Sequence, residues 1–153
     1  MYLENYIKGF ENKKIKIFVD MDGTIVDYVV GNSTDFADRR PLISSIAKLE
    51  KISKLKNVEL YILSVTRGDK GLKEKQEWLD KYANIFKKEN RIILSRESNN
   101  MASAYELKCN YLKTVERDED TVLIVIDDDP IVLKEIGNTN KDVKRLKDTA
   151  LVD

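Results

Sequence analysis

Short apolar runs alternate along the chain with segments in which apolar residues recur every three or four positions. Runs of the first kind are typical of strands buried on both faces, and the second period is typical of amphipathic helices. The alternation predicts βαβ units, and therefore a parallel sheet with helices on both faces. The predicted strands span residues 15–19, 58–63, 91–94 and 121–126. The predicted helices span residues 42–52, 72–86, 101–115 and 131–136.

Element ends and the two termini complete the expected architecture. Pro41 should lie in the first turn of the helix that follows it, where its missing N–H is harmless, and Gly137 should end the last predicted helix. Residues 1–14 and 142–153 each fit a short helix or an extra edge strand. No repeat or long linker divides the chain. We therefore expect one α/β domain over residues 1–153, a Rossmann-like three-layer sandwich with a central, mostly parallel sheet.

The composition agrees with a packed domain. Hydrophobic residues make up 42% of the 153 residues, which is enough for a buried core. The 27 basic and 27 acidic residues cancel, so a strong nonspecific binder of nucleic acid or anionic membranes is not expected. Cys109 has no second cysteine to pair with, and no apolar run approaches the roughly 20 residues of a membrane span. We expect a cytoplasmic protein with no membrane partner.

Two carboxylates stand one residue apart at the end of the first predicted strand, in Asp20-Met21-Asp22-Gly23-Thr24. Alternate residues of an extended chain point the same way, so both should reach one pocket, and Gly23 permits a sharp turn. One carboxylate can attack phosphorus while the other carries protons. The chain has no histidine, so metal ligands must be mainly oxygens, which favours Mg²⁺ over zinc.

Further polar residues stand at or beside the ends of the other predicted strands. Ser64 follows the second strand, Lys108 lies in the helix before the last strand, and Asp127, Asp128 and Asp129 close that strand. Ligands of an open parallel sheet bind outside the carboxyl ends of its strands, so these groups could converge. Taken singly, Ser64 could be a satisfied strand-end hydroxyl, Lys108 a surface lysine, and the triple aspartate a helix cap.

In this order the residues resemble the motifs of the haloacid dehalogenase superfamily of phosphohydrolases. Asp20-Met21-Asp22-Gly23-Thr24 matches the first motif, Ser64 the second, Lys108 the third and Asp127-Asp128 the fourth. The resemblance covers about residues 15–136 and implies the Rossmann-like core of that superfamily.

The resemblance also implies a role for each motif residue in the hydrolysis of a phosphomonoester. Asp20 would be the nucleophile that forms an aspartyl-phosphate. Asp22 would protonate the leaving oxygen and then deprotonate the attacking water. Ser64 would hydrogen-bond a phosphoryl oxygen, and Lys108 would offset negative charge on the phosphate and on Asp20. Lys113 is the alternative candidate for the active-site lysine.

The same resemblance implies a Mg²⁺ site. Asp20, the main-chain carbonyl of Asp22 and the carboxylate of Asp128 would hold the ion, with Asp127 in support and Asp129 facing outward. Capping of a helix by the acidic cluster is compatible with this role, because a cation relieves the repulsion among the acids.

The interval between the first two motifs is too short for the large helical cap of many relatives. Only a small flap over about residues 25–40 fits, so the resemblance points to the capless subgroup, whose open sites admit phosphates at polymer ends or on protein surfaces. Within it, Ser64-Val65-Thr66-Arg67 and the Lys-rich helix that follows are similar to the 3′-phosphatase domain of polynucleotide kinases. The 5′(3′)-deoxyribonucleotidases share this feature but carry a larger cap.

Several hydroxyl and guanidinium groups near the motifs are candidates for contacts with a phosphorylated substrate, since guanidinium groups bind phosphate through two hydrogen bonds. For each arginine the alternative is an ordinary exposed side chain, and Thr66 is also the alternative to Ser64. The candidates are Thr24, Thr66, Arg67, Arg40 and Arg39.

The leading hypothesis is a Mg²⁺-dependent phosphomonoesterase that acts through an aspartyl-phosphate on a nucleotide or a nucleic-acid end. The alternatives are a phosphatase of phosphoproteins or other small molecules and a catalytically inactive binding module. Phosphoacceptor receiver domains carry similar residues, but their acidic pair comes first and their lysine last, which is not the order found here. A partner subunit could supply the cap that this chain lacks.

Overall fold

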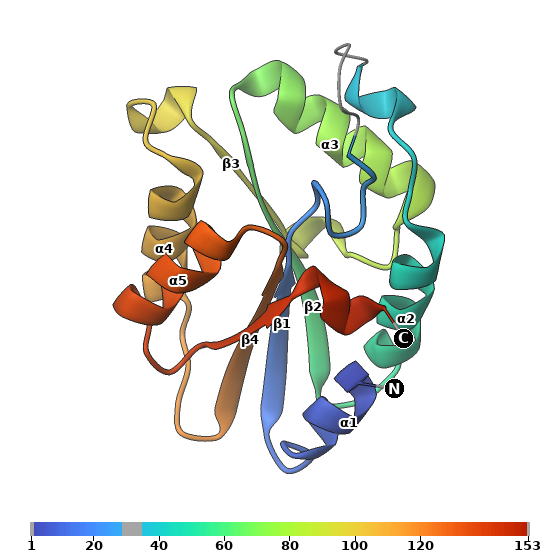
Figure 1. The fold of residues 1–153 in the computed structure, drawn as a ribbon, viewed down its shortest axis with the longest axis vertical. Helices are drawn as coiled ribbons and strands as arrows, with labels where there is room; N and C mark the ends of the chain where they lie inside the picture. Colours follow the sequence, from blue (N-terminus) through green and yellow to red (C-terminus); the bar gives the residue numbers. More distant parts are fainter. Residues whose placement is uncertain (1, 29–34, 153) are drawn as a thin grey trace.

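A five-stranded parallel sheet in the order β3-β2-β1-β4-β5 forms the centre of the computed structural model, which describes residues 2–28 and 35–152 (Figure 1). Because every pair of neighbours is parallel, all five strands end at the same edge of the sheet. The strands are β1 (Lys14–Val19), β2 (Val58–Thr66), β3 (Arg91–Ser95), β4 (Thr121–Asp127) and β5 (Lys144–Lys147). The helices are α1 (Tyr2–Lys8), α2 (Ile43–Ser53), α3 (Asp69–Tyr82), α4 (Ala104–Thr114) and α5 (Pro130–Thr139).

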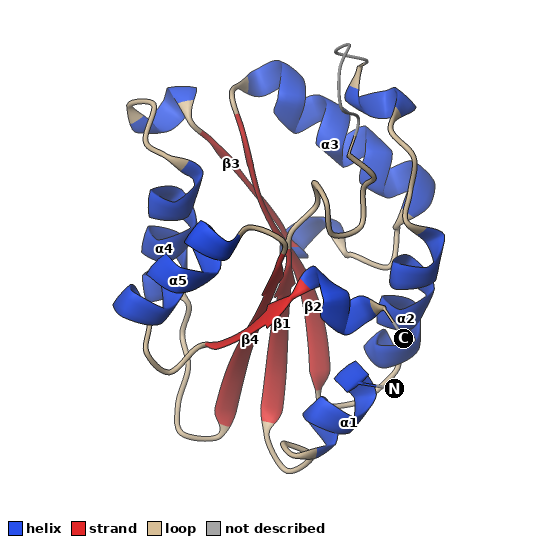
Figure 2. Ribbon diagram, in the orientation of Figure 1, coloured by secondary structure: helices blue, strands red, loops and turns tan. Residues whose placement is uncertain are grey.

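Helices cover both faces of the sheet, which makes the three layers of a Rossmann-like sandwich (Figure 2). Alternate residues of each strand point to opposite faces, so one strand supplies two cores. Ile17 and Val19 of β1 pack in the core beneath α1, α2 and α3, whereas Phe18 packs in the core beneath α4 and α5. The predicted α/β architecture with helices on both faces is therefore confirmed.

Each terminal segment forms one of the elements that its sequence allows, a short helix or an edge strand. The N-terminal segment forms the short helix α1, whose Leu3 and Ile7 are buried. The C-terminal segment forms β5 at the edge of the sheet, followed by the 3₁₀ helix η4 (Asp148–Leu151). Lys144, Arg145 and Lys147 keep this edge strand charged and exposed, which discourages pairing with another chain.

Two predicted helix boundaries are wrong. Pro41 precedes α2 instead of lying in it, because it forms an antiparallel bridge with Val26 and the next residue, Leu42, donates its N–H to the carbonyl of Ile25. Gly137 does not end α5, which continues to Thr139. A Cβ on this glycine would lie 2.1 Å from the guanidinium of Arg145, so the residue permits a close approach.

The boundaries of three other elements also differ from the predictions. Strand β2 runs through Ser64 to Thr66, because its pairing with β3 continues after its pairing with β1 has ended at Ile62. Helix α3 begins and ends earlier than predicted, since Ala83 leaves the helical conformation, although Phe86 beyond it is fully buried. Helix α4 begins later than predicted, because the side chain of its N-cap residue accepts a backbone N–H of the first turn and so fixes where the helix starts.

The predicted flap lies between β1 and α2, and residues 29–34 of it are outside the described part of the chain. At its base, the backbone N–H of Asp27 donates to the carbonyl of Arg40. Beyond the base lies the 3₁₀ helix η1 (Phe36–Asp38), whose first N–H donates to the side chain of Glu74 in α3 at 2.8 Å. Within residues 2–28 and 35–152, no helix is long and apolar enough to cross a membrane.

Candidate active site

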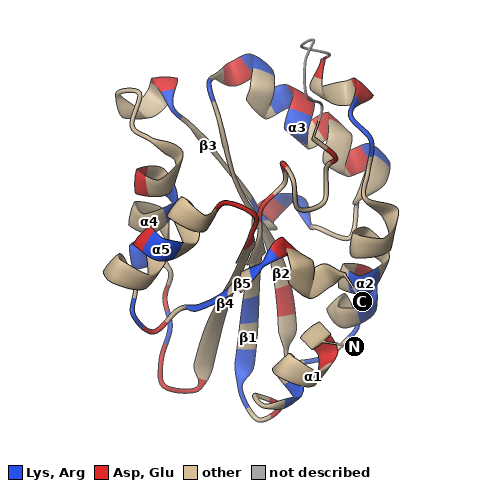
Figure 3. Cartoon of the chain, in the orientation of Figure 1, with Lys and Arg blue, Asp and Glu red and all other residues tan. Residues whose placement is uncertain are grey.

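The predicted motif residues lie at the carboxyl edge of the sheet, where β1 and β4 end side by side. The backbone N–H of Asp20 donates to the carbonyl of Ile126 at 3.0 Å, which places Asp20 beside Asp127, the last residue of β4. Figure 3 shows acidic residues in the turn between β4 and α5 at this edge. The β strands therefore bring the first and fourth motifs together, although they are far apart in the sequence.

A tight turn follows Asp20. The carbonyl of Met21 accepts the N–H groups of Thr24, Ile25 and Val26, and Gly23 takes φ +79°, a conformation that L side chains rarely adopt. A Cβ at Gly23 would lie only 2.2 Å from a carboxylate oxygen of Asp128. Gly23 is thus required both by the turn and by the approach of the fourth motif.

Lys108 connects two of the three acids at this edge. Its ammonium donates to Asp20 Oδ1 at 2.9 Å and to Asp127 Oδ2 at 2.7 Å, and all three side chains are buried. Lys113, the alternative lysine, is exposed. Of the two lysines, only Lys108 contacts the acidic residues in the described structure.

Asp20, Asp127 and Asp128 each offer a carboxylate oxygen within 4.8 Å of the others. Burial raises the pKa of Asp128 to about 7, and its hydrogen bond to Asp20 and the charges of the other two acids add to the effect. Burial and the charge of Asp20 raise the pKa of Asp127 to about 6, although Lys108 opposes this. Burial alone would lower the pKa of Lys108, but the two carboxylates outweigh it and raise that pKa above its usual value.

This cluster could hold a divalent cation. Three oxygen donors so close together, two of them with raised pKa values, indicate an excess of negative charge that a bound cation would relieve. Carboxylate oxygens are the ligands that Mg²⁺ and Ca²⁺ prefer. Asp129 is exposed and uses its side chain to cap α5, accepting the N–H of Ile131 at 2.9 Å, so it stands apart from the cluster.

Asp22 belongs to a second group of ionic contacts. Its Oδ1 accepts from Arg39 at 2.6 Å, and its Oδ2 accepts from Lys75 at 3.1 Å. Lys75 also donates to the hydroxyl of Ser64 at 2.7 Å and to the carbonyl of Val65 at 2.9 Å. The structure therefore joins Asp22 and Ser64, the predicted residues of the first and second motifs, through one buried ammonium.

Lys75 was not predicted from the sequence to lie at the site. The residue is only 4% exposed, although it lies in a helix rich in lysine and glutamate. A signal was present, because Lys75 precedes Trp78 by three positions and Leu79 by four and so shares their buried helical face. Trp78 is buried and donates its indole N–H to the carbonyl of Arg39 at 3.0 Å.

Tyr28 was also missed. The residue is 58% exposed, but its hydroxyl hydrogen-bonds Asp128. Burial of the hydroxyl and the negative charge of Asp128 raise the pKa of Tyr28 to about 12. Its place five residues after Gly23, in a segment without periodic pattern, gave no signal of this contact.

The predicted substrate contacts are only partly brought to the site. Thr24 is buried, and its hydroxyl lies 3.5 Å from Asp20 Oδ2. The hydroxyl of Thr66 packs instead against Gly71 in α3, where a Cβ would lie 1.9 Å away. Arg67 is exposed and pairs with Glu97 at 3.5 Å. Arg40 is exposed, and its backbone carbonyl accepts the N–H of Asp27 at the base of the flap.

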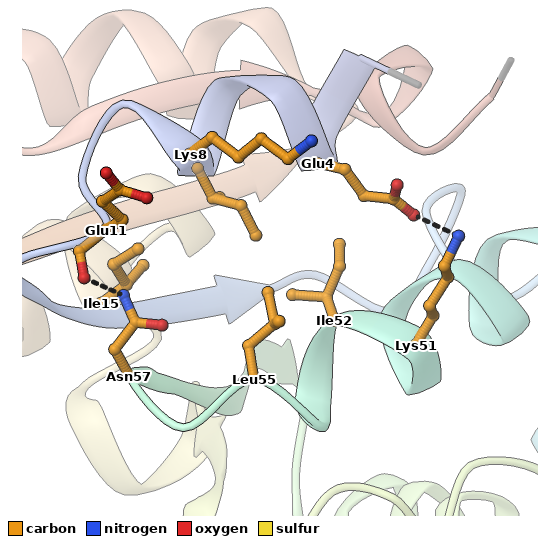
Figure 4. A pocket seen from close by; sticks show the side chains of 9 residues that line it. Glu4, Lys8, Glu11, Ile15, Lys51, Ile52, Leu55 and Asn57 are labelled. Atoms are coloured by element: carbon orange, nitrogen blue, oxygen red, sulfur yellow. Dashed lines mark hydrogen bonds and ion pairs between the residues drawn. The ribbon is translucent and has the colours of Figure 1, made fainter.

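A hollow of about 130 Å³ opens at the acidic cluster. Its lining combines acidic residues with Lys108, Tyr28 and a few apolar side chains. A larger hollow of about 260 Å³ lies at the other end of β1, between α1 and α2 (Figure 4). Its floor is apolar and the charged pair Glu4 and Lys51 stands at its rim, so it lacks the concentration of acids found at the first hollow.

Neither a family model nor a curated protein matches the chain. Among solved structures, a chain in the structure of the Pnkp1/Rnl/Hen1 RNA repair complex is similar, with 15% sequence identity and a TM-score of 0.64. The match covers 88% of this chain and 42% of that chain, so this chain spans about two-fifths of the length of its neighbour. At this identity the likeness shows the fold alone, a parallel sheet flanked by helices.

Proposed function

We propose that the chain is a Mg²⁺-dependent phosphomonoesterase in which Asp20 is the nucleophile. One observation carries the proposal: the carboxylate of Asp20 is held by Lys108 at 2.9 Å and lies in a cluster of three acids that fits a divalent cation. An ionised carboxylate in a fixed position beside a cation site is what attack on a phosphate ester requires. The motif resemblance to haloacid dehalogenase phosphohydrolases supports the same assignment.

In the proposed reaction, a carboxylate oxygen of Asp20 forms a bond to phosphorus while the bond from phosphorus to the leaving oxygen breaks. Asp22 gives its proton to that oxygen. Asp22 then takes a proton from a water molecule, whose oxygen attacks the aspartyl-phosphate and releases inorganic phosphate. Both oxygens of Asp22 accept hydrogen bonds in this structure, so when Asp22 carries a proton, the oxygen that bears it becomes a weaker acceptor for Arg39 or Lys75.

The donor set fits Mg²⁺. Asp20, Asp127 and Asp128 would surround the ion, together with the main-chain carbonyl of Asp22. When bound, Mg²⁺ supplies positive charge that neutralises phosphoryl oxygens. Lys108 would hold the carboxylate of Asp20 in position, because its ammonium is buried against two carboxylates.

A nucleotide or a nucleic-acid end is the proposed source of the phosphate. The segment between β1 and α2 is short, which suits an open site that admits the end of a polymer. The motif resemblance is to capless 3′-phosphatase domains, and the structural neighbour comes from a complex named for RNA repair. Phosphoproteins and other small phosphate esters are the competing substrates.

Hydrolysis of para-nitrophenyl phosphate with Mg²⁺ or with EDTA tests the chemistry. We expect turnover that needs the metal and falls at least about 1,000-fold in Asp20→Asn. Lys113→Met, which changes an exposed lysine of α4, should keep full activity. Turnover in EDTA, or equal turnover in Asp20→Asn, would contradict the mechanism. If no ester is hydrolysed while phosphate still binds, the chain is an inactive binding module.

Substrate choice needs a comparison between oligonucleotides of one sequence that carry a 3′-phosphate or a 5′-phosphate. Free nucleotides, a phosphopeptide and a sugar phosphate complete the set. We expect the highest kcat/KM on an oligonucleotide or a nucleotide. A sugar phosphate or a phosphopeptide that is cleaved much faster would overturn this assignment and leave the phosphatase chemistry intact.

A further inference from the structure

Lys75 is a buried lysine whose donors are all used. A lysine ammonium has three N–H groups and no lone pair, so it can donate three hydrogen bonds and accept none. Here the three acceptors are Ser64 Oγ at 2.7 Å, the carbonyl of Val65 at 2.9 Å and Asp22 Oδ2 at 3.1 Å. Lys75 therefore has no N–H left for a substrate unless it breaks one of these bonds.

This arrangement fixes the direction of the Ser64 hydroxyl. Because Lys75 can only donate, Ser64 Oγ must accept, and its own proton has to point elsewhere. Over residues 2–28 and 35–152, no hydrogen bond uses the Ser64 hydroxyl as a donor, and its side chain is buried. A buried hydroxyl proton without an acceptor is unfavourable, and a phosphoryl oxygen is an acceptor that would satisfy it.

We infer that Lys75 is a positioning residue, which makes Ser64 a hydrogen-bond donor toward phosphate and ties it to Asp22. The inference rests on the proposed function, since it assigns the phosphate to the same site. Lys75 suits this role because helix α3 holds it rigidly. Trp78 and Leu79 anchor its face of the helix in the core, and its ammonium lies 5.4 Å from the ring centre of Phe36.

Binding of inorganic phosphate with Mg²⁺, measured by calorimetry, tests the inference without need of turnover. The set is wild type, Lys75→Met, Ser64→Ala and the double variant. A hydrogen bond to a charged group is worth about 1.5–3 kcal/mol, so each single variant should bind phosphate about 10- to 100-fold more weakly. If Lys75 acts through Ser64, the double variant should bind about as weakly as Ser64→Ala alone.

Lys73→Met is the matched control, because Lys73 lies in the same helix and is exposed. It should bind phosphate as wild type does. Unchanged binding by Lys75→Met would overturn the inference. Losses that multiply in the double variant would also overturn it, since Lys75 would then act on phosphate independently of Ser64.

Thermal unfolding followed by circular dichroism checks that each variant is folded. If Lys75→Met does not fold, Lys75→Gln replaces it, and phosphate binding should again weaken because the amide carbonyl can take the Ser64 proton. Phosphate binding by wild type without hydrolysis of any ester would overturn the proposed function but not the role of Lys75. Absence of phosphate binding by the wild type would overturn both.

Discussion

Replacing Lys108 with methionine should destabilise the protein strongly, and more at pH 8 than at pH 5. Lys108 is 4% exposed, and its ammonium makes two short hydrogen bonds to carboxylates, at 2.7 and 2.9 Å. Removing one partner from a buried ionic group typically costs about 3–5 kcal/mol. Electrostatics gives a similar figure, because two negative charges no more than 4.8 Å apart repel by at least about 3.5 kcal/mol at an effective dielectric constant of about 20.

The pH dependence follows from the neighbouring acids. At pH 8, Asp127 and Asp128, with pKa values of about 6 and about 7, are largely ionised, so the missing cation leaves crowded negative charge. At pH 5 both are largely protonated in the wild type, and Lys108 has less charge to offset. We expect a loss of about 3–5 kcal/mol at pH 8 and less than about half of that at pH 5.

Urea unfolding in EDTA at both pH values measures these losses, with Lys113→Met as the control in the same helix. That exposed substitution should change the free energy of unfolding by less than about 0.5 kcal/mol. Added Mg²⁺ should restore part of the stability of Lys108→Met at pH 8, because a cation at the acidic cluster replaces the lost charge. A loss below about 1 kcal/mol at pH 8, or a larger loss at pH 5, would refute the reasoning.

Three further substitutions test separate features. In EDTA, the free energy of unfolding of the wild type should fall by about 1–2 kcal/mol between pH 4 and pH 7, because the folded state binds more protons than the unfolded state in that range. In Asp128→Asn, the free energy of unfolding should change less with pH over the same range. Gly23→Ala should lose about 1–3 kcal/mol in urea unfolding and bind Mg²⁺ more weakly, because it combines φ +79° with a clash against Asp128; a neutral effect would contradict the turn geometry. Arg91→Met should lower the free energy of unfolding in urea by about 2–4 kcal/mol, because the buried guanidinium binds the carbonyl of Phe86 and the carboxylate of Asp80. Phosphate binding should be unchanged, because Arg91 is the first residue of the outer strand β3, away from the carboxyl ends of β1 and β4.

The sheet was predictable because its strands are buried on both faces. Such strands are nearly continuous apolar runs, as in β1 and β4, and their alternation with helical periods leaves few topologies. The boundaries were less predictable, since they depend on contacts from distant segments. Pro41 is drawn into a bridge with Val26, and β2 continues past Ser64 because β3 pairs with it.

The acidic cluster was predictable for the same reason, because parallel strands carry Asp20 and Asp127 to one edge of the sheet. Lys75 and Tyr28 were not found, because their contacts with the site are made across the fold, those of Lys75 with Asp22 and Ser64 and that of Tyr28 with Asp128. In composition, the helix around Lys75 looks like a solvated surface. Only the spacing between Lys75 and Trp78 along the helix indicates that Lys75 is buried, and this spacing is informative only once the buried face of the helix is known.

The two aspartates of the first motif share the hollow but are held by different cations. Asp20 is bound by Lys108 from α4, on one face of the sheet, and Asp22 is bound by Lys75 from α3, on the other face. The sequence predicted one pocket, and the structure divides it into two ionic groups. In the proposed reaction this division has a physical use. Asp20 lies in the group with the crowded acids, where a cation would fit, whereas Asp22 lies in the group that holds Ser64. The electrostatic surroundings of a nucleophile and a proton carrier two residues apart can therefore differ, because their charged partners come from opposite layers of the fold.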